Sequence, residues 1–315
     1  MREIGGYIEL DTYHLPMLHE GALALNCGRN ALAYLIRARH IRRLWLPRLL
    51  CDSVPDVCAR EGTEVAWYRV GLDFLPAEEV DLGEDEWFYF VNYYSQFSND
   101  AIEEWVKRYG RVIVDNAQSY FQMPIPGVDT LYTCRKYFGV ADGAFLYTDA
   151  RLEEALPRDE SFERMRFLLG RLERGANEFY GEYVQNNRSF AAEPVKRMSA
   201  LTENLLHGID YAAVEARRKA NFALLRDRLG ELNELTPRES TFMYPLLMKD
   251  GAEVRKRLQA RRIYVPTLWP SERVLALPGQ PEYELSQNLL PLPMDQRYGR
   301  AEMKAVVEAI RACLA

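Results

Sequence analysis

Short apolar segments alternate with amphipathic helical segments along the first half of this sequence, and no other feature constrains the fold as strongly. The pattern predicts, in chain order, helix 28–41, strands 44–47, 64–70 and 86–94, helix 101–110 and strand 111–115. The strand segments are continuous apolar runs rather than alternating ones, which is typical of strands buried on both faces. We therefore expect an α/β fold around a mostly parallel sheet.

Two further strand patterns, at residues 128–133 and 143–148, follow each other with no helix between them. They flank the segment CRKYFGVAD, which is too short for the helical crossover that joins two neighbouring parallel strands. Strand–helix alternation therefore stops in this part of the chain.

The second half changes character. Residues 150–235 read as charged amphipathic helices, with Phe222, Leu225 and Leu229 on one helical face. Beyond this connector the pattern predicts strand 241–248, helix 251–262, strands 263–266 and 288–294 and a terminal helix, while residues 266–281 show the weakest pattern. We predict a large domain over residues 1–215, including the helical connector, and a small C-terminal α+β domain over residues 216–315.

Composition excludes several functional classes. The chain has 315 residues, 48% of them hydrophobic, so it can bury a large core. Its 40 Lys and Arg and 46 Asp and Glu residues are interspersed, which argues against nucleic acid as a partner. No apolar run is long enough to cross a bilayer, and the start of the sequence lacks the features of a secretory signal. We expect a cytoplasmic protein with no membrane partner.

The cysteines and histidines do not predict a metal site. The five cysteines form no CxxC pair, and their odd number fits reduced thiols better than a disulfide framework. The four histidines show neither HxH nor HxxxH spacing.

Three positions are candidates for chemistry. Asp115 ends an apolar strand, where ligands gather in open α/β sheets, although an aspartate there is equally suited to cap the following turn. Lys136 lies among Tyr132, Tyr137 and Phe138 in the sequence. An amine partly desolvated by such rings has the lowered pKa that a Schiff-base lysine needs. The simpler interpretation is a surface lysine beside an arginine. Gly28 directly precedes a helix, whose free N–H groups bind phosphate in some proteins and only water in many.

These features occur in a recognisable order: a Gly-Arg pair at a helix start, the strand end VDNAQSY, a lysine in CRKYFGV and the turn DGA before a strand. In this order the chain resembles the DegT/DnrJ/EryC1/StrS sugar aminotransferases, which are fold-type I enzymes dependent on pyridoxal 5'-phosphate (PLP). The segments NNRSFAAEPVKRMSALTENLL and LLPLPMDQRYGRAEMKAVVEAI are similar to later parts of that family. The resemblance implies a large domain with a mixed, mostly parallel sheet flanked by helices.

The resemblance also implies roles for individual residues. Lys136 would carry PLP as a Schiff base and would be the catalytic residue, with Asp115 against the ring nitrogen and Gln118 against the ring's 3-oxygen. The remaining residues would hold the phosphate; they are Gly28, Arg29, Thr133 and Asn187, the last reaching the partner subunit of a homodimer whose sites lie at the interface. The choice between Asn187 and Asn186 stays open.

Three departures from the family are visible. The segment RLLCDSV after Pro47 lacks the aromatic residue that stacks on the cofactor ring in other members. The family's serine, five residues before the lysine, falls on Leu131, with Thr133 as a replacement. The chain is also short for the family, which leaves little room for substrate loops.

The function implied by the resemblance is amino-group transfer from an amino acid, glutamate in our interpretation, to a nucleotide-linked keto-sugar, with pyridoxamine 5'-phosphate (PMP) as the other cofactor form. The pathway would make surface polysaccharides or secondary metabolites. Two alternatives stay open: another PLP-dependent reaction such as dehydration, racemisation or amino-acid transamination, and a non-catalytic sugar-binding protein on the same scaffold.

Overall fold

A seven-stranded sheet forms the centre of the larger region in the computed structural model, which describes residues 4–270 and 276–314. The strands, in chain order, are β1 (Leu23–Leu25), β2 (Arg43–Pro47), β3 (Glu64–Tyr68), β4 (Glu86–Val91), β5 (Val112–Asp115), β6 (Asp129–Thr133) and β7 (Ala144–Tyr147). Their order across the sheet is β1-β7-β6-β5-β4-β2-β3. All neighbouring pairs from β3 to β6 are parallel, and β7 is antiparallel to both β6 and β1. The predicted mixed, mostly parallel sheet is confirmed.

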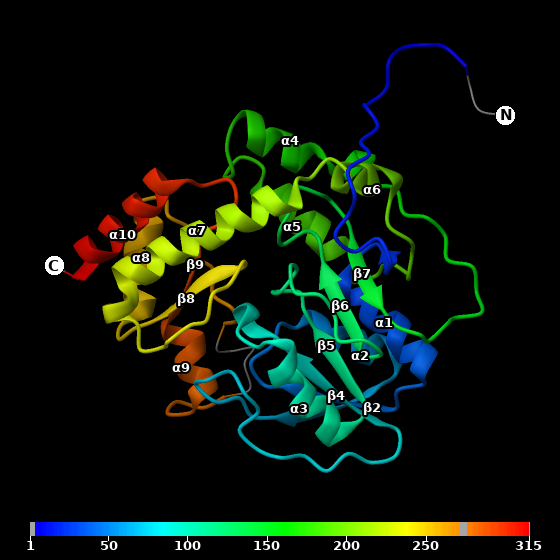
Figure 1. Ribbon diagram of the computed structural model, residues 1–315, viewed down its shortest axis with the longest axis horizontal. Coiled ribbons are helices and arrows are strands. Elements are labelled where there is room, and N and C mark those ends of the chain that lie inside the picture. The colour runs from blue at the N-terminus through cyan, green and yellow to red at the C-terminus, as the bar shows by residue number, and fades with distance from the viewer. Residues whose placement is uncertain (1–3, 271–275, 315) are drawn as a thin grey trace.

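Helices cover both faces of this sheet, which explains why its central strands are apolar along their whole length. The helices α1 (Gly28–Arg39) and α2 (Ser53–Glu61) pack against each other on one face, and α3 (Asn99–Tyr109) lies on the opposite face (Figure 1). All four residues of β5 are buried. The Ser98 hydroxyl caps α3 by accepting a hydrogen bond from the Ala101 N–H, and Gly110 ends the helix with φ +70°.

The connector and the second region are predominantly helical. The remaining elements are α4 (Arg166–Glu173), α5 (Tyr180–Ser189), α6 (Ala200–Leu206), α7 (Tyr211–Leu229), β8 (Met243–Leu247), α8 (Gly251–Ala260), α9 (Pro281–Asn288), β9 (Leu289–Pro293) and α10 (Arg300–Leu314), with short 3-10 helices at Tyr93–Ser95, Phe162–Arg164 and Gly230–Leu232. The strands β8 and β9 pair antiparallel, and α7, α8 and α10 pack beside them at the left of Figure 1.

The second region has a hydrophobic core of its own. Phe222, Leu225 and Leu229 of α7 are fully buried there, together with Met303 and Ile310 of α10. The long helix α7 begins against the large sheet and continues along the second core, so the predicted boundary between residues 215 and 216 falls inside one continuous helix.

The predicted strand at residues 263–266 is wrong. This segment has no regular structure and lies outside the two-stranded sheet of β8 and β9, and Pro266 lacks the N–H that a ladder requires. Its apolar character reflects the burial of Val265 in the second core. The strand predicted over residues 86–94 ends at Val91, after which the chain turns through Tyr94 with φ 51°. Part of the weak stretch at 266–281 lies outside the described residues.

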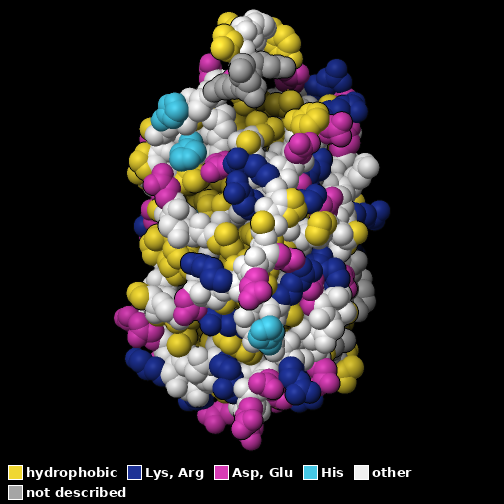
Figure 2. Space-filling model, turned by 90° about the vertical axis from the view of Figure 1, so that its right-hand side faces the viewer, with side chains coloured by type: hydrophobic (Ala, Val, Ile, Leu, Met, Phe, Trp, Pro, Cys, Tyr) yellow, Lys and Arg dark blue, Asp and Glu magenta, His cyan; other side chains and the backbone are white. Residues whose placement is uncertain are grey.

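Charged side chains of both signs are interspersed on the face shown in Figure 2. In the part of the chain that the structure describes, no helix combines the length and apolar character needed to span a membrane. The five cysteines are free thiols, four of them buried.

Candidate active site

The predicted site residues belong to segments that meet at one edge of the large sheet. The strands β1 and β6 both run antiparallel to β7, so they point in the same direction as each other and as β5. The carboxyl ends of β5 and β6 and the start of α1, which follows β1, therefore lie at the same edge. This is where ligands bind in open α/β sheets.

Asp115 is buried at the end of β5 and held by two hydrogen bonds. The Tyr89 hydroxyl donates to its Oδ2 at 2.9 Å, and the Ala117 backbone N–H donates to Oδ1 at 2.8 Å. Burial raises the pKa of Asp115, and the Lys136 ammonium and the two hydrogen bonds oppose that rise. Each oxygen retains a second lone pair, so a cationic N–H placed beside the carboxylate would be bound and would lower the same pKa.

Gln118 is buried in the turn that follows Asp115, and its side-chain oxygen accepts a hydrogen bond from the Tyr94 N–H at 2.8 Å. Its backbone carbonyl accepts from the Ser95 hydroxyl at 3.1 Å. Among the described residues, its amide nitrogen has no hydrogen-bond partner. This orientation leaves an N–H donor for a ligand oxygen.

Lys136 lies in the irregular segment between β6 and β7, and its side chain is exposed. In this respect the lysine fits the simpler interpretation, because Tyr137 and Phe138 turn into the core and leave its side chain facing outward. One ring remains beside it: Nζ lies 5.6 Å from the centroid of Phe242, which comes from the second region. Its charge acts on Asp115, so the predicted amine and acid face one site.

A cationic end of the site forms at the start of α1. Cys27, at the N-cap position, makes no side-chain cap, and the first turn contains no acid. A Cβ built on Gly28 would touch only the Cβ of Thr133, at 4.0 Å, so the helix start and the end of β6 are direct neighbours. The free N–H groups and the positive end of the helix dipole are suited to an anion.

Arg135 completes this end and is the site residue that the sequence analysis missed. Its buried Nε has no hydrogen-bond partner among the described residues, and a second nitrogen donates to the Asn187 side-chain oxygen. Burial lowers the pKa of Arg135, and the positive charge of Arg29 lowers it further. Thr133 and Arg135 are two residues apart, the spacing of one face of an extended chain, and this is the sequence signal that points to Arg135.

Arg29 and Arg135 form no ion pair with any described carboxylate. Instead, an Arg29 nitrogen donates to the Asn187 backbone carbonyl at 2.7 Å. Two neighbouring guanidinium groups, a buried N–H without a partner and an uncapped helix start therefore fit a phosphate dianion. The donor set at this end matches the phosphate of PLP, and Asp115 matches its ring nitrogen.

The two asparagines of α5 have different surroundings. Asn186 is buried, and its amide donates to the Ala141 carbonyl at 2.9 Å, whereas Asn187 contacts Arg29 and Arg135. Within one chain, Asn187 therefore lies at the cationic end and Asn186 does not. A contact of Asn187 with a partner subunit stays a prediction.

Comparison of the sequence with protein-family models and with curated proteins gives no match. Comparison with solved structures does. A DegT DnrJ EryC1 StrS aminotransferase from Brucella abortus is 17% identical, covering 93% of this chain and 86% of that one with a TM-score of 0.61. The sugar aminotransferase CalS13 from Micromonospora echinospora is 18% identical over 92% and 87% of the chains, with a TM-score of 0.62. The chain has the fold of the sugar aminotransferases. NtdA from Bacillus subtilis, solved with bound PMP, is 12% identical over 96% and 78%, with a TM-score of 0.63.

This aminotransferase fold carries no aromatic side chain in the segment after β2, where the resemblance places the ring-stacking residue. Leu49 and Leu50 are buried there, and the Leu49 carbonyl accepts a hydrogen bond from the Tyr93 hydroxyl at 2.5 Å. Leu131, at the family's serine position, is also buried. The face of a cofactor ring would therefore meet aliphatic rather than aromatic groups from this segment.

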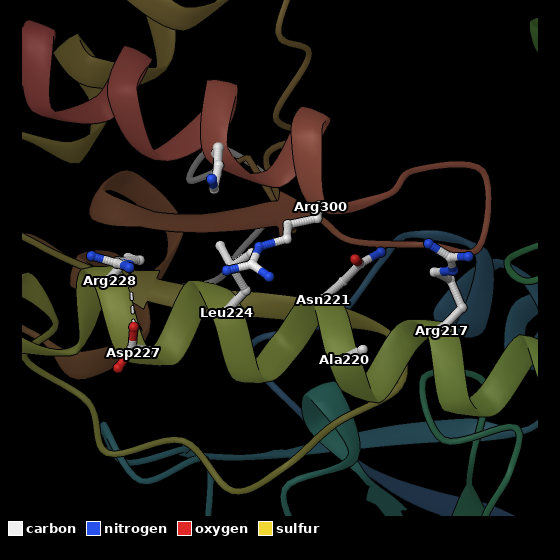
Figure 3. A pocket seen from close by; sticks show the side chains of 8 residues that line it. Arg217, Ala220, Asn221, Leu224, Asp227, Arg228 and Arg300 are labelled. Carbon is white, nitrogen blue, oxygen red and sulfur yellow. Dashed lines mark ion pairs between the residues drawn. The ribbon is translucent and has the colours of Figure 1, made fainter.

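Two cavities lie on the surface of the aminotransferase fold. One of about 460 Å³ adjoins the cationic end between α2 and α5; its lining includes Arg29, Asn187, Arg188, Tyr180 and Tyr183. The other, of about 340 Å³, lies between α7 and α10 and contains none of the predicted site residues (Figure 3). Its cations, which are Arg217, Arg228, Arg300 and Lys304, are exposed.

Proposed function

We propose that this chain is a PLP-dependent aminotransferase that transfers an amino group from glutamate to a nucleotide-linked keto-sugar. One observation carries the proposal: a buried carboxylate, an outward-facing lysine and an anion-binding pair of arginines converge at the carboxyl edge of a sheet with the aminotransferase fold. This set supplies one partner for each reactive part of PLP.

The residues divide the work. Asp115 keeps a ring nitrogen protonated, Gln118 donates to the ring's oxygen, and Arg29, Arg135, Thr133 and the start of α1 hold the phosphate. Bound PLP supplies an electron-accepting ring for the electrons released when the substrate carbon loses a proton. Lys136 anchors the cofactor aldehyde and, once released, moves the proton between substrate carbon and cofactor carbon.

The substrate class rests on the neighbours and on the larger cavity. CalS13 is described as a sugar aminotransferase, and the cavity beside the cationic end offers Arg188 for a phosphate and Tyr180 and Tyr183 for stacking against a base or sugar. A nucleotide-linked keto-sugar uses both kinds of group. We place the reaction in the cytoplasm, in surface-polysaccharide or secondary-metabolite synthesis.

We propose a homodimer with the sites at its interface. The N-terminal segment extends away from the body of the molecule (Figure 1), and its side chains Ile4, Tyr7 and Ile8 are 93–97% exposed. Two more apolar side chains are exposed on neighbouring helices: Leu172 on α4 and Tyr180 on α5, which lines the larger cavity. A second copy covering these side chains would bury apolar surface that a monomer leaves in water. The proposed reach of Asn187 to a partner's phosphate requires the same arrangement.

An absorption spectrum of the purified protein, reconstituted with PLP, tests the proposal. We expect a visible band that shifts to the ultraviolet when glutamate is added and returns when a keto-sugar nucleotide is supplied. Lys136→Ala should abolish both turnover and the borohydride-reducible attachment of PLP. Lys256, exposed on α8 in the second region, offers a matched control because Lys256→Ala removes a lysine outside the candidate site and should leave the spectrum unchanged.

The alternatives give different results. A visible band that does not respond to glutamate but changes with another amino acid or an amino-sugar would indicate a different PLP reaction. Failure of the wild-type chain to bind PLP would contradict the proposal and favour a sugar-binding protein.

A further inference from the structure

Arg218 of α7 is buried at the junction of the two regions and only 1% exposed. No described carboxylate pairs with it. Its guanidinium donates instead to neutral oxygens: Gln296 Oε1 at 2.8 Å, the Thr241 carbonyl at 2.6 Å and the Tyr137 carbonyl at 3.2 Å. The Asp295 carboxylate attracts this charge without forming an ion pair with it, so neutral oxygens supply all of the hydrogen bonds. Such a buried charge is costly, because a methionine of similar size would fill the same space without losing hydration.

The contacts of Arg218 converge on the segment that carries Lys136. Tyr137 directly follows the lysine, and its carbonyl accepts a second hydrogen bond from the Gln296 side-chain nitrogen at 2.7 Å. The Arg218 guanidinium also lies 4.6 Å from the centroid of the Tyr137 ring. Two side chains from separate segments of the second half of the chain therefore hold one peptide group next to the lysine.

Arg218 also binds the backbone of Phe242, whose ring lies beside the lysine amine. It donates to the Phe242 carbonyl at 3.4 Å, and the Phe242 ring lies beside the Lys136 Nζ and 5.8 Å from the Tyr137 ring. The backbone after Lys136 and the aromatic group beside its amine are thus bound by the same guanidinium. Since the lysine side chain itself is exposed, these contacts are what limit its direction.

We propose that Arg218 is a positioning residue that fixes Lys136 by clamping the Tyr137 carbonyl and the Phe242 backbone together. Thr241, Phe242 and Gln296 belong to the second region, whereas Tyr137 belongs to the region of the large sheet. Because Arg218 binds residues of both regions, a movement of the second region is transmitted to the lysine. The value of this placement for catalysis rests on the proposed function, but the placement itself does not.

The first test uses the protein without cofactor. Amide hydrogen exchange at Tyr137, Phe138 and Val140 reports the local structure, because each of these N–H groups is hydrogen-bonded within the segment. Arg218→Met should raise their exchange by roughly ten- to a hundredfold, the loss expected for hydrogen bonds to a charged group, while β4 and β5 keep wild-type exchange. Arg218→Lys should restore part of the protection. Arg217→Met, at the neighbouring exposed position labelled in Figure 3, is the matched control.

The second test uses PLP. Arg218→Met should slow the formation of the borohydride-reducible bond to Lys136 and change the pH dependence of the visible band, with kcat lowered more than KM is raised. Unchanged exchange at the three amides, or an equal rise throughout the sheet, overturns the clamp. If Arg218→Met does not fold, Gln296→Met removes one donor to the same carbonyl and should produce a smaller change with the same pattern. Failure of the wild-type chain to bind PLP would reject the proposed function while the exchange result still decides the clamp.

Discussion

The two ends of the candidate site differ in how completely their polar groups are bonded without a ligand. At the acid end, Asp115 is buried and accepts hydrogen bonds from Tyr89 and Ala117. At the cationic end, Arg29 and Arg135 both donate to Asn187 rather than to a described carboxylate, and the Arg135 Nε has no described partner. The acid end is held in place by hydrogen bonds within the chain and keeps acceptor capacity for a ligand, whereas the cationic end has donors without a counter-charge.

This difference assigns separate tasks to the two ends. A buried carboxylate that two hydrogen bonds already orient keeps its position when a ligand arrives, so it is suited to tuning the electronic state of a ring. Unpaired guanidinium groups gain their counter-charge from the ligand, so they are suited to supplying affinity. Chemistry and affinity should therefore respond to different substitutions.

Asp115→Asn should have the largest effect and should act on chemistry. We expect amine transfer to fall by roughly 100- to 1,000-fold, the scale for losing one preorganised electrostatic partner, while the PLP dissociation constant changes far less. The free energy of unfolding of the cofactor-free variant should be unchanged or higher, because burial raises the pKa of Asp115 and its charged form therefore costs stability at neutral pH. Single-turnover kinetics and urea unfolding measure the two quantities. A variant that loses PLP affinity and activity equally would break the division of tasks.

His19 is buried among aromatic side chains that surround β6 and β7. It is fully buried, its ring centroid lies 4.2 Å from that of Tyr132, and its Nε2 donates to the Tyr120 carbonyl at 2.8 Å. Burial lowers the pKa of His19 from 6.5 to about 4. Between these two pH values His19 is protonated in the unfolded chain and neutral in the folded chain. Stability should be fully present above pH 6.5 and fall by about 3 kcal/mol as the pH drops toward 4.

Urea unfolding across this pH window tests the contribution of His19. His19→Gln keeps a donor for the Tyr120 carbonyl but does not titrate, so its stability should vary less with pH than that of the wild type. Parallel pH curves for the two proteins would assign the acid sensitivity to other groups.

Arg135→Met should act on affinity alone. Losing a charge-assisted hydrogen bond should weaken PLP binding by roughly ten- to a hundredfold, and the binding of pyridoxal, which lacks the phosphate, should be nearly unaffected. Equilibrium titration followed by absorbance compares the two aldehydes. Arg217→Met, at an exposed arginine on α7 outside the candidate site, serves as the control. An equal loss for both aldehydes would show that Arg135 supports the fold rather than the phosphate.

Thr133→Val should give the smallest change. The two side chains have nearly the same shape, and the Thr133 hydroxyl has no hydrogen-bond partner among the described residues, so folding should be little affected. One hydrogen bond to phosphate contributes about 1 kcal/mol, which corresponds to about a fivefold loss of PLP affinity. The same titration detects it, and a loss as large as that of Arg135→Met would mean that the threonine, not the arginine, dominates the cationic end.

The architecture of the first region was predictable because its signals are local. Continuous apolar runs require burial on both faces, and the missing helix between residues 133 and 143 requires a reversal, which β7 provides. The segment 263–266 misled for the opposite reason. An apolar run shows that side chains such as Val265 are buried, but burial alone does not show whether the backbone joins a sheet, and this segment lies outside the sheet of β8 and β9.

The candidate site was predictable in outline but not in detail. The positions of Asp115, Lys136 and Gly28 at strand and helix ends follow from order along the chain. The outward direction of Lys136 does not, because it depends on contacts with Arg218 and Gln296 more than 80 residues further along the chain. Arg135 was missed because an arginine beside a lysine is ordinarily a surface charge. Only the structure shows that no described carboxylate pairs with it.

The exposure of Lys136 has a consequence for the order of events in loading. An amine open to solvent reacts with any aldehyde that reaches it, so the amine itself does not choose among metabolites that carry a carbonyl group. On the proposed assignment of the phosphate site, the choice is made by residence time: an aldehyde that also bears a phosphate would stay at the start of α1 long enough to condense, whereas others would leave first. The prosthetic group would then be selected by how long it stays bound, at a site separate from the lysine nitrogen that forms the bond.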